Sequence, residues 1–196
     1  MSAVLALVAI VAVQWVYIVG LHAQREQERD RTRRAQEEAA LADHDALTGL
    51  LGRAAWMRAF AARQTRGVLL FCDVNDFKSV NDAHGHLVGD QVLRETARLL
   101  RRVLGPVPLI GRYGGDELVA FLPSPVDISA EALEALCARL AAPFTVAGIT
   151  LSLSVGGVTA QPGSDLDQLL RQADFAMLRY KRERRSAGRQ TPSRSR

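Results

Sequence analysis

Residues 109–122 read Leu-Ile-Gly-Arg-Tyr-Gly-Gly-Asp-Glu-Leu-Val-Ala-Phe-Leu, and this stretch decides the fold. Residues 109–110 and 118–122 are short apolar runs of the kind that form β-strands. Gly114 and Gly115 lie between the runs, and a glycine pair there predicts a tight turn because such turns require a positive φ. The stretch therefore predicts a β-hairpin.

Apolar patterns on both sides of this hairpin indicate the rest of the fold. A continuous apolar run at residues 68–72 predicts a strand buried on both faces. The hairpins interrupt an alternation of helices and strands, so we expect an α/β (α+β) fold with a mixed, largely antiparallel sheet. The remaining expected elements are helices at 92–104, 131–140 and 166–180 and a second hairpin at 144–146 and 150–155.

The composition fits one ordinary domain with an appendage. Of the 196 residues, 48% are hydrophobic and 23% are charged, which excludes a disordered or collagen-like chain. Two cysteines, Cys72 and Cys137, are too few for a disulfide scaffold and are predicted to be reduced packing residues. The net charge of +4 permits a nucleic acid, an anionic lipid or a phosphorylated ligand and does not choose between them.

The first residues carry a membrane signal. Residues 3–21 form a 19-residue stretch without a formal charge. As a helix this stretch would span roughly 28 Å, close to the ~30 Å hydrocarbon core of a bilayer. No Lys or Arg precedes Arg25, which disfavours a cleaved signal peptide, so residues 1–22 are predicted to form a transmembrane anchor. The arginines that follow place the C-terminal bulk in the cytoplasm.

Two charged segments flank the predicted globular part, residues 45–189. Residues 23–44 contain no Gly or Pro, which predicts a linker helix. Alanines at 35, 39, 42 and 46 form its only apolar seam, so a solvated linker and a dimerising stalk both stay open. From Ser186 the chain is rich in Ser, Arg and Pro, and residues 190–196 are predicted to form a disordered basic tail.

Carboxylates stand at the ends of two predicted strands. Asp73 follows the apolar run 68–72, and Asp116 follows the glycine pair of the hairpin. If the hairpin packs beside that run, Asp73 and Asp116 meet at one sheet edge. Unit like charges 4 Å apart cost about 4 kcal/mol at an effective dielectric of 20. Such a pair favours a divalent cation, and oxygen-only ligands indicate Mg²⁺ or Mn²⁺. Each carboxylate alone would more often be solvated.

Cations and polar groups near these carboxylates suit a nucleoside triphosphate. The chain has only two lysines, Lys78 and Lys181, and Arg185 follows Lys181 by one helical turn. Three cations and a metal suit a triphosphate, although cations at a helix end also suit its dipole. The residue types that a guanine edge needs are present as Asn81 and Asp90, which could instead be helix caps.

Two histidines nearby, His84 and His86, raise the question of zinc. No cysteine or third histidine joins them, so zinc is not expected.

The residues resemble the GGDEF-domain diguanylate cyclases in five ordered motifs. Residues 112–118, Arg-Tyr-Gly-Gly-Asp-Glu-Leu, are similar to the signature loop of that family. The resemblance covers residues 45–189. The other motifs are residues 45–50, the series Asp73, Phe77, Lys78, Asn81, Asp82, Gly85, His86, Gly89 and Asp90, residues 154–156, and Ala173-Asp174 followed by Lys181.

The resemblance implies synthesis of cyclic di-GMP from two GTP molecules, with release of pyrophosphate. It implies a nucleotidyl-cyclase palm with a five-stranded sheet flanked by helices, and a homodimer as the active unit. It also implies Mg²⁺ or Mn²⁺ as cofactor. Together with the anchor and the arginines described above, it leads us to expect a catalytic domain in the cytoplasm at the inner (cytoplasmic) membrane and no nucleic acid as partner. The carried-over roles are metal binding by Asp73, the Val74 carbonyl and Asp116; catalysis by Asp116 and Glu117, with Glu117 beside the reacting 3′-hydroxyl as base or further metal contact; guanine recognition by Asn81 and Asp90, with His86 near the nucleotide; phosphate binding by Lys78, Lys181 and Arg185; and substrate contact at Gly114 and Gly115.

The sequence departs from the family pattern at four places. Leu118 replaces the usual Phe of the signature and is expected to pack rather than react. Gly52 replaces an Asn, and Arg184 replaces a Gly before Arg185. The family's Arg-x-x-Asp product-inhibition motif is missing, because residues 105–108 read Gly-Pro-Val-Pro. We therefore expect no product inhibition through this stretch.

Two other classes of function remain open from the sequence. The domain could be a catalytically weak GTP-binding module that acts through protein contacts, since the alanine seam predicts only weak dimerisation. It could also be a membrane-tethered basic adaptor for nucleic acid or lipid, an interpretation based on the arginine-rich linker and tail. The retained acidic residues and Lys78 favour the enzyme.

Overall fold

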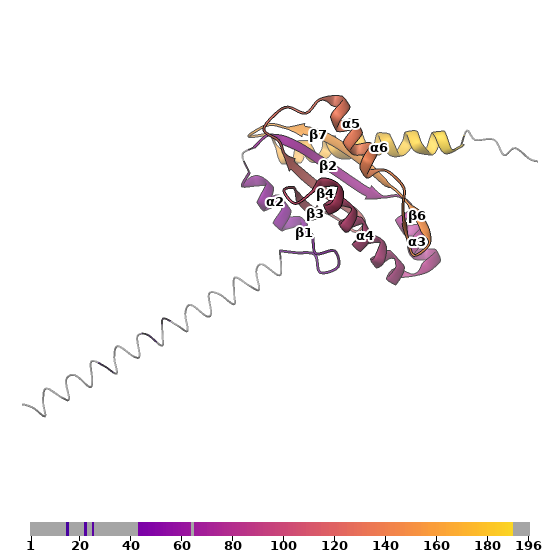
Figure 1. Cartoon of the computed structure of the whole chain (residues 1–196), viewed down its shortest axis with the longest axis horizontal. Helices are drawn as coiled ribbons and strands as arrows, with labels where there is room; N and C mark the ends of the chain where they lie inside the picture. Colours follow the sequence, from indigo (N-terminus) through magenta and orange to yellow (C-terminus); the bar gives the residue numbers. More distant parts are fainter. Residues whose placement is uncertain (1–14, 16–21, 23–24, 26–42, 64, 190–196) are drawn as a thin grey trace, which may run out of the picture. The chain divides into compact units, whose positions relative to one another are not determined.

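The computed structural model describes residues 15, 22, 25, 43–63 and 65–189, with side chains described up to residue 183 (Figure 1). The chain divides into two compact units, Met1–Ala42 and Asp43–Arg196, and nearly all described residues belong to the second. No helix among the described residues is long and apolar enough to cross a membrane. The anchor, linker and tail predicted at 1–22, 23–44 and 190–196 lie outside the described residues, apart from Trp15, His22, Arg25, Asp43 and His44.

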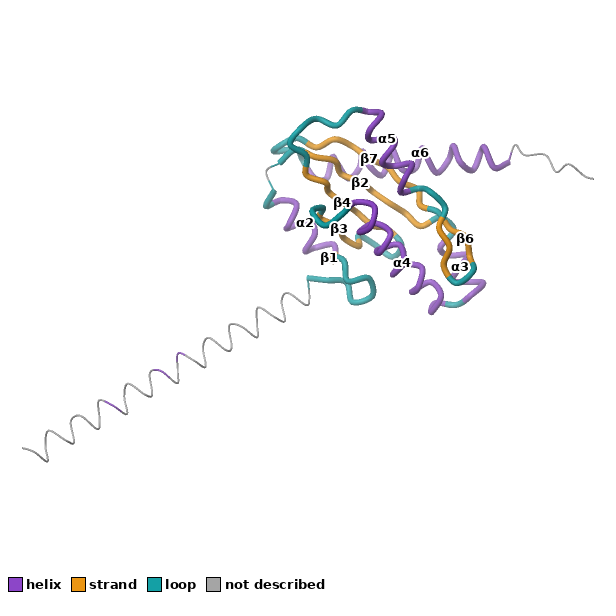
Figure 2. The backbone as a smooth tube through the Cα atoms, in the orientation of Figure 1, coloured by secondary structure: helices purple, strands orange, loops and turns teal. Residues whose placement is uncertain are grey.

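A mixed five-stranded sheet forms the centre of the second unit, as the sequence predicts (Figure 2). Only the β1–β3 pair is parallel, and the other three pairs are antiparallel. The predicted hairpin of residues 109–122 is formed by β3 and β4. The sheet order is β1 (Leu51–Gly52), β3 (Leu109–Arg112), β4 (Glu117–Pro123), β2 (Gly67–Val74) and β7 (Leu153–Ala160).

Strand β2 is the inner strand around which the fold is built. It pairs with β4 along one edge and with β7 along the other, and residues 67–72 are all buried. Alternate side chains of a strand point to opposite faces, so an inner strand with helices on both faces has no solvent-facing position. This position in the sheet explains the continuous apolar run at residues 68–72.

Helices cover both faces of the sheet. Val68, Leu70 and Cys72 of β2 belong to one buried cluster together with residues of α4 and α5. Leu69 and Phe71, which point the other way, belong to a second cluster with residues of α2 and α6. The fold therefore has three layers, helix, sheet and helix. The helices are α2 (Arg53–Ala61), α3 (Phe77–His84), α4 (His86–Leu104), α5 (Ala130–Leu140) and α6 (Leu166–Arg189).

The predicted second hairpin differs from the structure at its second strand. Instead of one strand at residues 150–155, β6 (Ile149–Leu151) pairs with β5 (Phe144–Val146), and β7 begins separately at Leu153 in the main sheet. The chain changes sheets at Ser152. Its hydroxyl accepts a hydrogen bond from the amide of Asn75 at 2.9 Å, and the Ser154 hydroxyl donates to the carbonyl of the same amide at 2.6 Å. A partner far away in the sequence therefore fixes the break.

Candidate functional site

Three carboxylates meet where β2 ends and β4 begins. In the antiparallel register Asp73 stands opposite Glu117, and the backbone N–H of Val74 donates to the carbonyl oxygen of Asp116 at 3.3 Å. The predicted meeting of Asp73 and Asp116 at one sheet edge is therefore found. The strand register creates the acidic cluster, because it places Asp73 opposite Glu117, the first residue of β4, and Asp116 directly precedes that residue.

The cluster opposes its own ionisation. Burial, and then the charge of Asp73, raise the pKa of Asp116 above its usual value. Burial also raises the pKa of Glu117, and the charges of Asp116, Asp73 and Asp174 add to the effect. Carboxylates that share a site in this way disfavour one another's charged forms. Positive charge beside the cluster would therefore favour the ionised forms of Asp116 and Glu117.

Lys181 supplies part of that charge. Its Nζ forms an ion pair with Oδ1 of Asp73, across 108 positions of sequence and from the opposite end of the domain. Both side chains are mostly enclosed, with 23% of Lys181 and 14% of Asp73 exposed. An ion pair this shielded is weakened less by salt than a surface pair. Lys181, the predicted phosphate ligand, thus forms an ion pair with Asp73, a predicted metal ligand.

The two signature glycines, Gly114 and Gly115, matter for the space that they leave and not for a left-handed backbone conformation. Neither Gly114 nor Gly115 has a positive φ, so the reason given above for a glycine pair in this turn is wrong. A Cβ at residue 114 would lie 2.5 Å from Oε2 of Glu117, whose side chain folds back over the loop. At Gly115 nothing lies within 4 Å of such a Cβ, which leaves open space beside the backbone.

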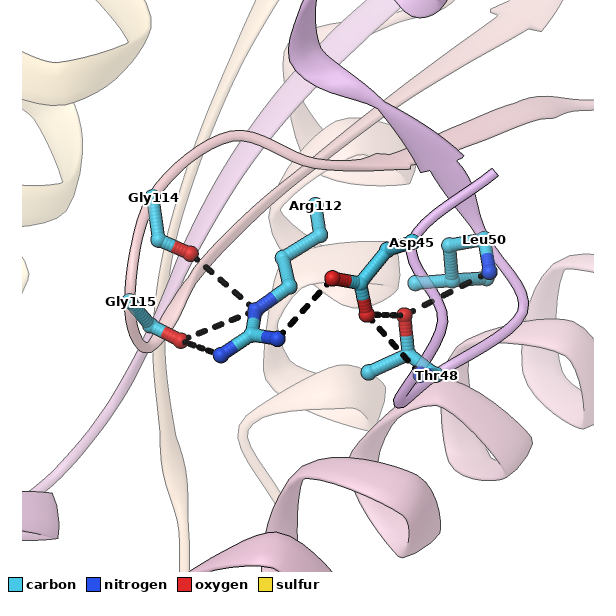
Figure 3. A network of polar contacts seen from close by, with 6 residues as sticks. All are labelled: Asp45, Thr48, Leu50, Arg112, Gly114 and Gly115. Carbon is cyan, nitrogen blue, oxygen red and sulfur yellow. Dashed lines mark hydrogen bonds and ion pairs between the residues drawn. The ribbon is translucent and has the colours of Figure 1, made fainter. Parts of the chain in front are cut away.

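Arg112 ties the signature loop to the beginning of the domain (Figure 3). Its guanidinium donates to the carbonyl oxygen of Gly114 at 3.2 Å and to that of Gly115 at 3.1 and 2.7 Å. Nη1 also donates to Oδ2 of Asp45 at 3.0 Å, and the other Asp45 oxygen accepts from the backbone and hydroxyl of Thr48 at 2.8 and 2.6 Å. The N-terminal motif and the loop are therefore held as one unit.

Arg53 and Asp174 extend this cluster, and the sequence did not single out either one as a site residue. The Arg53 guanidinium lies 4.2 Å from the centre of the Tyr113 ring, a distance typical of a cation–π contact. Its charge counteracts the rise in the pKa of Glu117, whereas Asp174 adds to it. The resemblance marks Asp174 as part of a motif without giving it a role, and no local pattern indicates either contact, because the partners are distant in sequence.

The predicted guanine-binding pair lies at the corner between α3 and α4. Asn81 and Asp90 are both half-buried, on α3 and α4 respectively. Gly85 separates the two helices with a φ of 80° and is both the C-cap of α3 and the N-cap of α4. The alternative that Asn81 and Asp90 are helix caps is therefore excluded. Leu118 is fully buried, as expected for a packing residue.

Three predicted ligands lie at the margin of the described site. Lys78 and His86 are exposed on α3 and at the start of α4. The side chain of Arg185 lies outside the described residues. Within the described part of the chain, no three His, Cys, Asp or Glu side chains form a group that could hold a metal ion by themselves. A metal at the carboxylate cluster would need further ligands, such as a backbone carbonyl or the substrate.

The Asp45→Asn variant is expected to be less stable by about 1–2 kcal/mol at neutral pH, because a half-buried ion pair and its charged acceptor are lost. Burial pushes the pKa of Asp45 upward, but the Thr48 hydrogen bonds and Arg112 outweigh it and the net pKa lies below 3.8. A carboxyl whose pKa is lower in the folded state than in the unfolded state stabilises the fold at a pH above the unfolded-state pKa. The difference in unfolding free energy between parent and variant should therefore vanish as the pH falls below 3.8 and through the folded-state pKa.

Urea unfolding at a series of pH values measures this difference. Asp43→Asn is the matched control, because Asp43 pairs with Arg58 at an exposed site. An equal, pH-independent loss in both variants would contradict the prediction.

Comparison with known proteins identifies the family of the domain. The profile described as "Diguanylate cyclase, GGDEF domain" matches residues 42–187. Diguanylate cyclase DgcP of Pseudomonas aeruginosa is 38% identical over 158 residues, covering 75% of this chain and 23% of DgcP. Cyclic di-GMP phosphodiesterase PdeR of Escherichia coli is 37% identical over 158 residues, covering 74% of this chain and 23% of PdeR. The chain thus spans about a quarter of the length of these relatives.

A solved structure agrees with the profile. The coiled coil and GGDEF domain of DgcB from Caulobacter crescentus, in complex with c-di-GMP, is 28% identical with a TM-score of 0.67. The match covers 82% of this chain and 92% of the DgcB chain. Since the family profile matches well over half of the sequence, the chain belongs to the diguanylate cyclase GGDEF-domain family.

Proposed function

We propose that the protein condenses two GTP molecules into cyclic di-GMP and releases two pyrophosphates. The observation that carries this proposal is the cluster of Asp73, Asp116 and Glu117, set by strand register beside the signature loop and faced by Lys181. Such a cluster is costly in a merely structural role, because the pKa values of Asp116 and Glu117 are both raised by burial and by neighbouring carboxylates.

The donor set fits Mg²⁺ or Mn²⁺. Asp73 and Asp116 offer carboxylate oxygens and Val74 a backbone carbonyl, the ligand types that hard divalent cations prefer. The mutual repulsion of the carboxylates is the observation that supports a cation here, since Lys181 neutralises only one charge. A set this small leaves coordination positions for phosphate oxygens. When bound, the metal would stabilise charge on the transferring phosphoryl group.

The side chains of the chain then have separate tasks in the transfer. Glu117 takes the proton of the attacking 3′-hydroxyl, and its raised pKa brings it closer to the range in which a carboxylate is an effective base. The hydroxyl oxygen forms a bond to the α-phosphorus of the other GTP, and the bond to pyrophosphate breaks. Arg112 fixes the loop that carries Asp116 and Glu117, so that the reacting groups are held in position.

Substrate binding is assigned to residues around this centre. Asn81 and Asp90 read the guanine edge from the α3–α4 corner, with His86 close to the nucleotide. Lys78, Lys181 and Arg185 bind the phosphates. For this, Lys181 would exchange its contact with Asp73 for a phosphate oxygen. Gly115 leaves room for substrate beside the backbone.

Each domain carries one GTP, so we propose a homodimer with two sites facing each other. The DgcB structure contains a coiled coil next to its GGDEF domain, which supports a dimerising role for residues 23–44. No contact between copies of this chain is described.

The assay uses the purified full chain in detergent with GTP and Mg²⁺, and a second preparation whose dimerisation is enforced by a fused coiled coil. Pyrophosphate release and the nucleotide product are followed together. Cyclic di-GMP as the product supports the proposal. GTP that binds but stays unconverted under enforced dimerisation would overturn it and favour a GTP-binding module that acts through protein contacts. The match to a relative named as a phosphodiesterase is the observation that keeps this second function open.

We also propose that residues 1–22 anchor the protein in the cytoplasmic membrane with the catalytic domain in the cytoplasm. The support is the uncharged stretch 3–21 followed by arginines. Deleting residues 1–22 should move the protein from the membrane fraction to the supernatant after alkaline carbonate extraction. A full chain that is itself released by carbonate would contradict the anchor.

Product inhibition through residues 105–108 is not expected. These residues, Gly-Pro-Val-Pro, lie beside a surface cavity of about 500 Å³ lined by Gly105, Pro106 and Pro108. Arg101 also lines the cavity but donates to the carbonyl oxygen of Gly49 at 2.7 Å, and no carboxylate lines it. Added cyclic di-GMP should therefore slow turnover only by competition with GTP. Inhibition that saturating GTP does not relieve would contradict this.

A further inference from the structure

One buried polar atom lacks a partner. Among the described residues, Oδ1 of Asn81 is the single buried side-chain nitrogen or oxygen without a hydrogen-bond partner. A buried, unsatisfied carbonyl costs free energy, and native structures keep few of them. Asn81 as a whole is half-buried, whereas its Oδ1 is enclosed.

Gly89 of α4 creates the space for that enclosed end. A Cβ built at residue 89 would lie 1.9 Å from Oδ1 and 3.0 Å from Cγ of Asn81, and 3.3 Å from Cζ of Phe77. Gly89 is buried within a helix and has no positive φ, so its backbone conformation does not require glycine. Glycine in a helix interior is less favourable than alanine. The close approach of Asn81 is therefore the reason for glycine at this position.

The orientation of the amide decides what Asn81 offers to a ligand. The oxygen and the nitrogen of a carboxamide diverge from Cγ, so an oxygen held against α4 leaves Nδ2 to face away from it. Asn81 then presents a hydrogen-bond donor. Guanine carries an acceptor oxygen at C6, whereas adenine carries a donor amino group there. Asp90, which follows Gly89 directly, supplies the acceptor for the neighbouring donors of guanine.

We propose that Gly89 is a positioning residue that sets base selectivity: by admitting the Asn81 oxygen against α4, it directs Nδ2 toward the base and favours a 6-oxo over a 6-amino purine. The inference rests on the proposed function, since it takes a guanine nucleotide as the substrate. Gly89 itself contacts no substrate and acts only through Asn81.

Binding is measured by calorimetry on the full chain with two probes that cannot release pyrophosphate, the α,β-methylene triphosphates of guanosine and of 2,6-diaminopurine riboside. Both probes carry the 2-amino group and differ at N1 and C6. In Gly89→Ala the affinity for the guanosine probe is expected to fall about tenfold, which corresponds to about 1.4 kcal/mol. The affinity for the diaminopurine probe should change less than threefold, so the preference of the protein for the guanosine probe over the diaminopurine probe becomes smaller.

A double-mutant cycle separates positioning from packing. In an Asn81→Ala background the Asn81 carboxamide no longer occupies the space beside residue 89, and the milder 3.3 Å contact with Cζ of Phe77 remains. Adding Gly89→Ala should therefore cause no further loss of guanosine-probe binding. The double variant should also unfold at a higher temperature than Asn81→Ala alone, because alanine is the better helix former. This background keeps the test valid even if Gly89→Ala alone folds poorly.

Two results would overturn the inference while leaving the proposed function intact. One is an equal loss of affinity for both probes in Gly89→Ala, and the other is a further loss in the Asn81→Ala background. A parent protein that binds neither probe would instead overturn the proposed function, and this inference with it.

Discussion

Glu117→Gln is expected to reduce cyclic di-GMP formation about a thousandfold while leaving the fold intact. The reduction lies within the range of a lost general base, since glutamine keeps the shape of the side chain but cannot take a proton. Stability should not fall, because burial and neighbouring carboxylates raise the pKa of Glu117 and thus disfavour its charge in the folded state. Rates of product formation and thermal unfolding curves measure the two effects separately.

Glu134→Gln is the control for this variant. Glu134 is an exposed glutamate of α5 and is not part of the carboxylate cluster, so the same substitution there should leave the rate unchanged. A Glu117→Gln rate within a few-fold of the parent would exclude Glu117 as the base. Binding of the guanosine α,β-methylene triphosphate should persist in the variant, which separates lost chemistry from lost binding.

Asp73→Asn should lower the rate of cyclic di-GMP formation by more than about a hundredfold, because it removes a carboxylate ligand at the reacting phosphate. Its effect on stability has two opposing parts. Lys181 loses its partner, but Asp116 and Glu117 lose a repelling neighbour. The repulsion that is removed and the ion-pair attraction that is lost are of similar size. We therefore expect the melting temperature of Asp73→Asn to lie within a few degrees of the parent's.

The matched control for Asp73→Asn is Asp127→Asn. Asp127 is also an ion-paired aspartate, at 3.5 Å from Arg66, but it is 75% exposed. The control should retain full activity and nearly full stability, as expected for a surface pair. If Asp73→Asn unfolds far below the parent, the ion pair dominates and the site is structural; if its rate is normal, Asp73 holds no essential ligand position.

The sequence predicts the main sheet well because its strands have unambiguous local patterns. The run at 68–72 is continuous because β2 is covered on both faces, and the hairpin of β3 and β4 follows from its two apolar runs and short turn. The boundary at Ser152 was missed because its partner, Asn75, lies 77 positions away. Polar residues in a strand indicate exposure unless such a distant partner is known.

The sequence names candidate site residues but does not indicate most of the contacts between them. Strand register brings Asp73 to Glu117, and that much can be foreseen once the hairpin is placed beside β2. The pairing of Lys181 with Asp73 and the contact of Arg53 with Tyr113 join elements that are far apart in the sequence. Such contacts depend on how helices are laid across the sheet, which periodicity does not specify.

The long reach of the Lys181–Asp73 pair has a consequence for the order of synthesis. On a ribosome β2 emerges long before α6, and 108 residues separate the two members of the pair. The nascent chain therefore displays an acidic cluster without its built-in counter-charge until the final helix has been translated. A message truncated before codon 181 would yield a product that keeps the signature loop but lacks Lys181, the partner of Asp73. On the proposed function, enzymatic activity would therefore depend on completion of the last helix.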